Sequence, residues 1–485
     1  MTGKKYDVII IGGGVVGSAV ARELSRYRLC ICVLEKELDV CNGVSGRNTG
    51  LLHSGILSGE HSLRTECCIE GNAEFDRVAR ELDVPFKRCG KLIVGFGERE
   101  KRSLEELFSH GKKCGIPGIR MIGHDEIRAI EPNADGEWAI HVPTAGILCP
   151  YTYTIALAEN AARNGVHYYF DQEVTAIDRS EESYCVHTGN TEWHSRWVIN
   201  CAGVSACRIS PMLGFGEYIP RRVKGEYEIL DKKVGRFLSV PIYPAPGEDG
   251  DCDLHITPTV DGNVLVGPTL EEVGEEEDYR ATREKIDLLA RQGARLFPNH
   301  VKREYFIRNY VGIFPYVADP LTGERVDFQI QSDKRIPHAV NVVGISTPGL
   351  TSALPIARRV VEKVKEQEDL AVNERFCPVR KGIVRFADQD DEGKRRLIRQ
   401  DPDYGEICCR CECVTMAEIR QAVHNILGVS TVSGIKYRTR ATMGRCQGGY
   451  CETRITSMIE EELKKEVTEV LWNQKNSQMF TGRVK

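Results

Sequence analysis

Two short groups of cysteines lie near the C-terminus, where their thiols could share a metal. Residues 408–413 read CCRCEC, and residues 446–451 read CQGGYC after a stretch that favours a helix. Thiolates are soft ligands that suit both zinc and iron–sulfur clusters, and spacing alone does not choose between them. The sequence therefore predicts a site of four thiolates, two from each group.

A glycine-rich turn lies at the opposite end of the chain. Residues 12–17, GGGVVG, follow the apolar run 7–11, DVIII, and lead into a segment that favours a helix. In this G-x-G-x-x-G pattern Gly12 permits a tight turn, Gly14 lets the backbone approach a pyrophosphate, and Gly17 lets the helix pack closely on the strand. The pattern predicts a strand, a phosphate-binding turn and a helix.

A second apolar run supports a dinucleotide site. Residues 30–34 predict the next strand, which ends at Glu35, about 20 residues beyond the glycines. A carboxylate at that point can bind the hydroxyls of an adenosine ribose. The helix predicted over Ser18 to Tyr27 would direct its N-terminal N–H groups at the phosphates. Together these features predict a dinucleotide on an N-terminal Rossmann unit.

The next loop favours FAD over NAD. Residues 43–55, GVSGRNTGLLHSG, are small, polar and rich in glycine. A loop of this kind can run beside a long cofactor and donate backbone N–H groups to its phosphates and ribityl chain. Three further segments, at residues 172–175, 198–203 and 344–352, also bear on the choice of family.

In these segments the chain resembles the D-amino-acid-oxidase-like FAD superfamily, especially the anaerobic glycerol-3-phosphate dehydrogenase large subunit and the L-2-hydroxyglutarate dehydrogenase group. The resemblance covers most of the first 365 residues. It implies FAD as cofactor. Beside the glycine turn and Glu35, the implied contacts are Ser45, Arg47, Asn48, Thr49, Gly50, Leu52, Val174, Ala202, Gly203, Gly349, Leu350 and Thr351.

The same resemblance implies an α/β fold with interleaved domains. A Rossmann-type FAD-binding domain would comprise about residues 1–88, 151–210 and 312–365, and an antiparallel-sheet substrate domain about 89–150 and 211–311. Residues 366–405 are strongly charged, lack a sustained apolar period and are predicted to be a surface linker. Residues 406–485 would form a small helical iron–sulfur domain.

The cysteine groups are similar to the bacterioferritin-associated-ferredoxin-like 2Fe-2S domain. This resemblance makes Cys409, Cys411, Cys446 and Cys451 the cluster ligands. Cys411 and Cys413 form a second C-x-C pair, so a shifted register remains an alternative. A structural zinc site is the other interpretation.

Three side chains are candidates for catalysis. His53 follows the flavin loop and matches a family histidine near the isoalloxazine ring; it would remove the hydroxyl proton while hydride passes to flavin N5, or would only position the flavin. His255 resembles a substrate-domain histidine of the hydroxyglutarate group. Lys224 could hold an anionic group, although a solvated strand end is an equal alternative.

At two positions that bear on substrate binding, the chain departs from the pattern of the family that it resembles. Glycerol-3-phosphate dehydrogenases place an arginine four residues after the loop histidine, where this chain has Leu57, and Gly312-Ile313-Phe314-Pro315 replaces the usual Gly-Val/Ile-Arg-Pro. An arginine fork is the natural grip for phosphate or carboxylate.

We therefore expect an FAD-dependent dehydrogenase of a small hydroxylated, anionic metabolite, with glycerol 3-phosphate or a 2-hydroxy acid such as 2-hydroxyglutarate as candidates. An amine or amino-acid dehydrogenase, or an electron-transfer subunit without its own metabolite, are the alternatives. A 2Fe-2S cluster implies an electron-accepting protein, such as a second flavoprotein, because it carries single electrons. An oligomer is also expected.

Composition agrees with an ordinary globular enzyme. The formal net charge is −5, and no block of like charge suggests nucleic acid as a partner. No stretch approaches the roughly 20 apolar residues that cross a bilayer, and the N-terminus shows no signal-peptide pattern. These features predict a cytoplasmic protein. Nineteen cysteines are many for that compartment, where structural disulfides are rare, which again favours a metal site.

Overall fold

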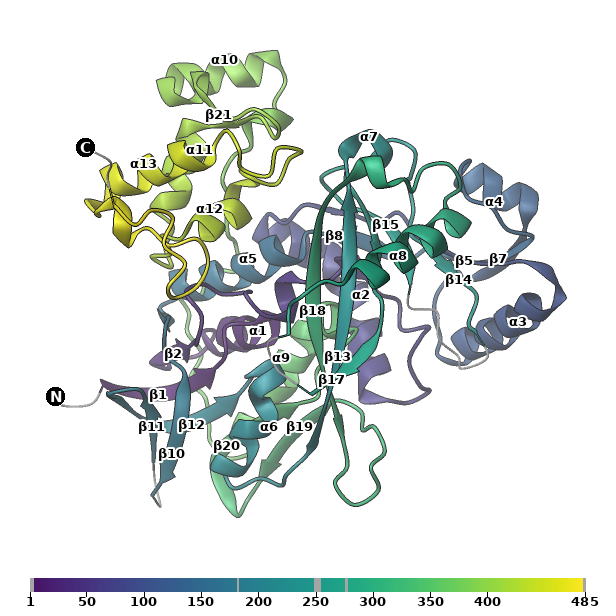
Figure 1. Ribbon diagram of the computed structural model, residues 1–485. Coiled ribbons are helices and arrows are strands. Elements are labelled where there is room, and N and C mark those ends of the chain that lie inside the picture. Colours follow the sequence, from purple (N-terminus) through teal and green to yellow (C-terminus); the bar gives the residue numbers. More distant parts are fainter. Residues whose placement is uncertain (1–3, 181–182, 248–253, 275–277, 483–485) are drawn as a thin grey trace.

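The computed structural model describes residues 4–180, 183–247, 254–274 and 278–482, and contains two large sheets whose strands alternate along the chain (Figure 1). The first sheet has the order β10-β11-β12-β1-β2-β9, with β20 beside β12 and β19 beside β20. Its strands are β1 (Lys4–Ile11), β2 (Ile31–Leu34), β9 (His167–Tyr169), β10 (Val174–Arg179), β11 (Tyr184–Thr188), β12 (Thr191–Asn200), β19 (Gln329–Asp333) and β20 (Ile336–Val343).

The centre of this sheet is parallel and buried on both faces. Strand β1 pairs in parallel with β2 and β12, and Val8, Ile9 and Ile10 are fully buried. Parallel strands covered on both faces are continuous apolar runs, as residues 7–11 are. The covering helices on one face are α1 (Val15–Leu24), α5 (Pro150–Arg163) and α9 (Gly349–Lys365), and α2 (Leu63–Leu82) packs on α9. This is the predicted Rossmann unit.

The second sheet has the order β17-β13-β16-β15-β14-β5-β7-β6, with β18 beside β13. All its pairs are antiparallel except β5 with β14, so the sheet expected to be antiparallel is mixed there. Its strands are β5 (Lys91–Gly95), β6 (Arg120–Gly123), β7 (Trp138–Val142), β13 (Ile219–Leu230), β14 (Ile242–Pro244), β15 (His255–Pro258), β16 (Val264–Gly267), β17 (Glu271–Val273) and β18 (Phe306–Ala318). The helices beside it are α3 (Gly97–Lys113), α4 (His124–Ile130), α7 (Lys232–Gly235) and α8 (Arg283–Leu296).

One boundary differs from the division drawn from the sequence. Strand β18 pairs with β13 along its whole length, from Phe306 to Ala318. Residues 312–318 therefore belong to the second sheet and not to the flavin-binding part, because the strand runs on unbroken after Val311. A small third sheet, formed by β3 (Leu51–Leu52), β8 (Gly146–Leu148) and β4 (Phe86–Lys87), connects the two parts.

The C-terminal part is a compact helical unit, drawn in yellow and yellow-green in Figure 1. It contains β21 (Ile407–Cys409), β22 (Val414–Thr415), α11 (Met416–Val423), α12 (Val432–Thr439) and α13 (Glu452–Leu463) around its own apolar core. No helix in the described part of the chain is long and apolar enough to cross a membrane.

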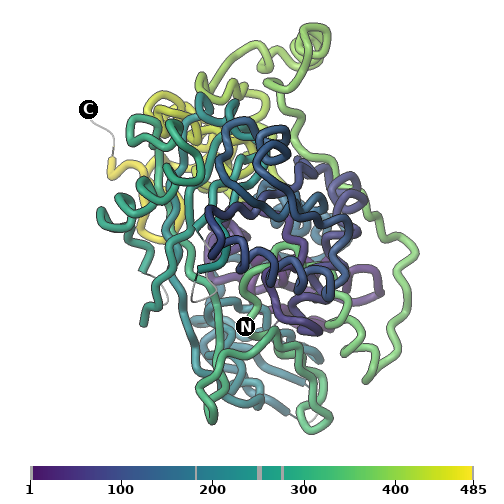
Figure 2. The backbone as a smooth tube through the Cα atoms, turned by 90° about the vertical axis from the view of Figure 1, so that its right-hand side faces the viewer, coloured from purple at the N-terminus to yellow at the C-terminus, as the bar shows by residue number. Residues whose placement is uncertain are grey.

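The segment expected to be a surface linker has more structure than a tether. Figure 2 shows it running along the outside of the molecule. Arg380 is buried and bonds Glu159 of α5, and helix α10 (Asp391–Gln400) packs Leu397 against Ala417 of the C-terminal unit. Its charges did not indicate this structure because some of them are paired with other parts of the chain, which composition does not show.

Gly17 controls the crossing of α1 over β1. A Cβ atom on Gly17 would overlap the carbonyl oxygen of Gly12. Gly12 itself has a φ of 102°, which glycine adopts readily and other residues rarely do. We expect Gly17→Ala to lower the free energy of unfolding by about 2–3 kcal/mol, because backbone must shift to relieve the clash. Thermal unfolding followed by circular dichroism measures this. Gly216→Ala is the control, since a Cβ added there would meet no atom of the described residues within 4 Å; equal melting temperatures would contradict the prediction.

Candidate active site and cysteine site

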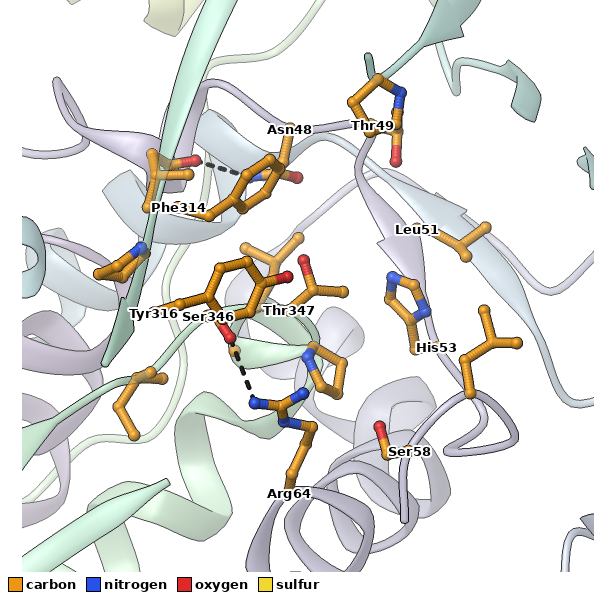
Figure 3. A pocket seen from close by; sticks show the side chains of 18 of the residues that line it. Asn48, Thr49, Leu51, His53, Ser58, Arg64, Phe314, Tyr316, Ser346 and Thr347 are labelled. Atoms are coloured by element: carbon orange, nitrogen blue, oxygen red, sulfur yellow. Dashed lines mark hydrogen bonds between the residues drawn. The ribbon is translucent and has the colours of Figure 1, made fainter. Parts of the chain in front are cut away.

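A cavity of about 660 Å³ lies between the two large sheets. Its walls come from the glycine turn, the loop that follows β2, strands β5, β14 and β18, and the turn before α9. Figure 3 shows His53, Arg64, Phe314, Tyr316 and Thr347 directed around one shared space. Elements distant in sequence therefore build a single site.

The glycine turn leaves room for a phosphate group. Gly14 precedes α1, and a Cβ added to it would meet only one atom within 4 Å among the described residues, Ser45 Oγ. The N–H of Val15 donates to that hydroxyl at 3.0 Å. No acidic residue occupies the first turn of α1, so its N-terminus keeps the positive potential that favours an anion. The residues present fit a pyrophosphate.

Glu35 supports this turn from behind. Its buried carboxylate accepts hydrogen bonds from the N–H groups of Gly13, at 2.6 Å, and Glu37, at 2.9 Å. Burial raises the pKa of Glu35 although both hydrogen bonds oppose the rise. The carboxylate therefore holds the turn in shape at the edge where the predicted ribose would lie.

The other predicted cofactor residues divide into two groups. Those in the cavity wall are Gly14, Val15, Ser45, Asn48, Thr49, Gly203, Gly349 and Leu350. Those outside the wall are Gly12, Gly17, Arg47, Gly50, Leu52, Val174, Ala202 and Thr351. Among these, Arg47 lies over the ring of Tyr279 at 4.0 Å, and Leu51 lines the cavity where Leu52 packs into the core.

Two of the three predicted catalytic residues line the cavity. His53 is fixed through its backbone: its N–H donates to Thr351 Oγ1 at 3.0 Å, and its carbonyl accepts from Asn72 Nδ2 at 2.7 Å. His255 stacks on Tyr243 with ring centroids 4.0 Å apart, and its Nε2 lies 3.3 Å from Thr49 Oγ1. The structure thus places both histidines at one cavity, His53 from the loop after β3 and His255 from β15.

The third predicted residue, Lys224, does not line the cavity. Its buried ammonium group lies 3.1 Å from Asp278 and 3.8 Å from Glu226. Buried charges are retained where they are paired, and these two carboxylates satisfy that condition. The geometry gives Lys224 a structural ion pair rather than contact with a substrate.

His53 is neutral at neutral pH. Burial lowers its pKa well below the ordinary value, and the positive charge of Lys91 and the neighbouring His255 lower it further. A neutral imidazole can accept a proton, which suits a general base.

Sequence reasoning missed the charged residues that line the cavity. Arg64 from α2, Lys91 from β5 and Arg325 from the loop after β18 all contribute, whereas none of the described lining residues is Asp or Glu. Leu57 and Phe314, which replace the expected arginines, also face the cavity. No local motif marks Arg64 or Arg325, so only their position in the fold reveals them.

The cysteine site consists of two close pairs. Cys411 and Cys446 have their sulfur atoms 3.6 Å apart. Cys451 donates a hydrogen bond to Cys409, which lowers the pKa of Cys409, whereas burial and the charge of Glu412 oppose this shift. A Cβ on Gly444 would overlap Cys411, so this glycine allows the two cysteine loops to meet.

The four sulfurs are arranged as two pairs rather than as one equidistant group. Among the described residues, no three of these four sulfurs lie within 4.8 Å of one another. Tetrahedral zinc would hold four thiolates equally close, about 3.8 Å apart for Zn–S bonds of about 2.3 Å. Cys408 is fully buried in the apolar core, and the exposed Cys413 faces the Arg410 carbonyl. The pairing thus involves the four predicted cysteines.

These features define a flavin-dependent oxidoreductase with an iron–sulfur unit, and comparison with known proteins agrees. The profile of the FAD dependent oxidoreductase (DAO) family matches residues 7–363, and that of the BFD-like [2Fe-2S] binding domain matches residues 407–461. The chain belongs to the FAD dependent oxidoreductase family. FAD and a 2Fe-2S cluster are its cofactors, which resolves the choice between iron–sulfur and zinc.

Individual relatives include dehydrogenases named for two different hydroxy compounds. The chain is 36% identical over 488 residues to a glycerol 3-phosphate dehydrogenase of Caloramator mitchellensis, with 99% of both chains covered. It is 29% identical to the mitochondrial L-2-hydroxyglutarate dehydrogenase of Nematostella vectensis, covering 75% of this chain and 91% of the relative. Among solved structures, FAD-bound L-alpha-glycerophosphate oxidase from Mycoplasma pneumoniae aligns with a TM-score of 0.72 and 26% identity, covering 78% of this chain and 98% of that one.

The cysteine pairing can be tested by metal content. We expect Cys446→Ser to remove iron and the visible absorption that exceeds that of flavin, because one member of an exposed pair is lost. Cys413→Ser is the matched control and should retain both, since its thiol lies against the Arg410 carbonyl. Elemental analysis of the purified proteins measures iron and zinc. Zinc without iron in the unaltered chain, or iron loss only in Cys413→Ser, would refute this assignment.

Proposed function

We propose that this chain is a dehydrogenase that oxidises a small hydroxylated, anionic metabolite, with glycerol 3-phosphate and 2-hydroxy acids such as 2-hydroxyglutarate as the candidates. The observation that carries the proposal is the charge of the cavity. Three cationic side chains and three histidines line it, and none of its described lining residues is acidic. A cationic cavity favours an anion over a neutral or cationic ligand.

The residues around the cavity have separate tasks. Residues 12–17, Ser45 and the N-terminus of α9 would hold FAD, which supplies an acceptor for hydride. His53 would accept the proton of the substrate hydroxyl, because it is neutral and its backbone is fixed at both ends. His255, held by stacking on Tyr243, would orient the hydroxyl-bearing carbon from the opposite wall.

An acceptor protein would receive the electrons. A 2Fe-2S cluster supplies one-electron transfer, and Cys411 and Cys446 are exposed. Exposed ligands allow a partner, such as a second flavoprotein, to approach the cluster closely. We also propose a cytoplasmic location, supported by the absence of disulfides among the described cysteines, and an oligomeric assembly.

Anaerobic reduction of the bound flavin tests the proposed function. Glycerol 3-phosphate, L-2-hydroxyglutarate, glycerol and a set of amino acids are added separately, and flavin bleaching is followed. We expect at least one anionic hydroxy compound to reduce the flavin and glycerol to be far slower, because only the anions use the cationic wall. Reduction by an amino acid alone would replace the proposal with amine oxidation. Reduction only by a partner flavoprotein would indicate an electron-transfer subunit.

The role of His53 has a pH signature. Its pKa is depressed, so the basic form is present at neutral pH and is lost only as the pH falls through the lowered pKa. We expect the rate of flavin reduction to be flat at and above neutral pH and to decline on the acid side. His53→Gln should lower the rate by about 100-fold or more and remove the acid limb.

Lys91→Met provides the matched comparison in the same stopped-flow measurement. Burial would still depress the pKa of His53, but the repulsion from Lys91 would be gone. The acid limb should therefore move to higher pH. An unchanged limb in both variants would exclude His53 as the titrating base.

A further inference from the structure

The guanidinium of Arg64 makes fewer hydrogen bonds within the described part of the chain than it has donors for. It lies in the first turn of α2, and its side chain is 16% exposed. Its Nη2 donates a long hydrogen bond of 3.5 Å to Ser346 Oγ, whereas its buried Nε finds no hydrogen-bond partner in the described part of the chain. Asp327 comes no closer to this Nε than 3.9 Å. Because Arg64 lines the cavity and its bond to Ser346 is long, its guanidinium can still donate to a ligand there.

A second guanidinium lies beside it. Arg325 is exposed at the cavity wall, with its guanidinium carbon 3.3 Å from the centroid of the Tyr316 ring. The guanidinium carbon of Arg64 lies 6.0 Å from the same centroid. Two like charges beside one ring repel each other, and burial together with Arg325 lowers the pKa of Arg64. An anion between them would relieve that repulsion.

These arginines are distinct from the phosphate-binding turn of the cofactor. The turn at Gly14 is completed by Ser45, whereas Arg64 bonds Ser346 in the loop before α9. Figure 3 shows Arg64 below Tyr316 and facing the same space as Thr347 and His53. A charge at this place acts on the substrate rather than on the pyrophosphate.

We propose that Arg64 and Arg325 form the anion subsite of the substrate and that it takes the phosphate group of a phosphorylated alcohol. This inference rests on the proposed function and narrows its substrate class. A phosphate monoester carries close to two negative charges at pH 7 and three terminal oxygens, so two guanidinium groups from different elements can bind it together. A planar carboxylate, in contrast, can be bound by two parallel N–H groups of a single guanidinium. The pair replaces the arginines absent at Leu57 and Phe314.

The aromatic rings beside the arginines support the assignment. Tyr316 stacks under the guanidinium of Arg325 and Phe328 lies 5.2 Å from that of Arg64. Aromatic faces hold a guanidinium in place and leave its N–H edge for an oxyanion. The subsite is therefore built before the substrate arrives, which reduces the entropy lost on binding.

The test measures flavin reduction by glycerol 3-phosphate and by L-2-hydroxyglutarate in the full holoenzyme and in Arg64→Ala, Arg64→Lys and Arg325→Ala. For glycerol 3-phosphate we expect the substrate concentration at half-maximal rate to rise on the order of 10–100-fold in the alanine variants. The limiting rate should fall less, and Arg64→Lys should lose part of the effect. Arg77→Met is the matched control, because Arg77 is an exposed arginine of the same helix, 52% exposed.

A second measurement needs no turnover. Inorganic phosphate added to the oxidised holoenzyme should perturb the flavin spectrum, and the alanine variants should weaken that binding while Arg77→Met leaves it unchanged. Arg325→Ala keeps the test valid if loss of the buried Arg64 prevents folding.

Unaltered binding and kinetics in both alanine variants would overturn the subsite. An enzyme reduced by L-2-hydroxyglutarate but not by glycerol 3-phosphate would overturn the phosphate assignment. If no anionic compound reduces the flavin of the unaltered chain, the proposed function itself fails.

Discussion

One buried guanidinium, that of Arg440, connects the three parts of the chain. It donates to Tyr151 of the flavin-binding part at 3.0 Å, to Asp261 beside the second sheet at 2.6 Å, and to Glu412 of the C-terminal unit at 2.8 Å. Loss of one partner from a buried charge network costs about 3–5 kcal/mol, because an uncompensated charge remains. The relative position of the flavin cavity and the cysteine site depends on this junction.

The junction acts on the cysteine site through Glu412, which lies between Cys411 and Cys413 and is buried. A second buried ion pair reinforces it: Arg438 bonds Asp39 at 2.6 Å, and both side chains are almost fully buried. Asp39 belongs to the loop that leads to Ser45 and the cavity wall. The same packing therefore orders a flavin-binding loop and a cysteine loop, so that a fixed separation between the two cofactors is a property of the fold.

The sequence was informative where function depends on neighbouring residues. The glycine turn follows directly from Gly12, Gly14 and Gly17, since backbone room is a local requirement. The cysteine pairs were visible for the same reason. Arg64 and Arg325 were not, because they meet at Tyr316 only after the fold brings together segments about 260 residues apart. The charge of Lys224 was visible in the sequence, but its ion pair was not, because Asp278 lies 54 residues further on.

The positive charge of the cavity wall connects the proposed anion subsite to His53, the proposed base. Desolvation and the positive charge of Lys91 lower the pKa of His53, and no carboxylate among the described residues of the cavity wall opposes them. An anion bound in that wall would offset part of the positive field and favour the protonated imidazole. The proton would therefore be accepted most readily when a charged substrate is in place. A cavity without carboxylates thus gives selectivity for anions and makes the base respond to the substrate, and one aspartate in the wall would weaken both.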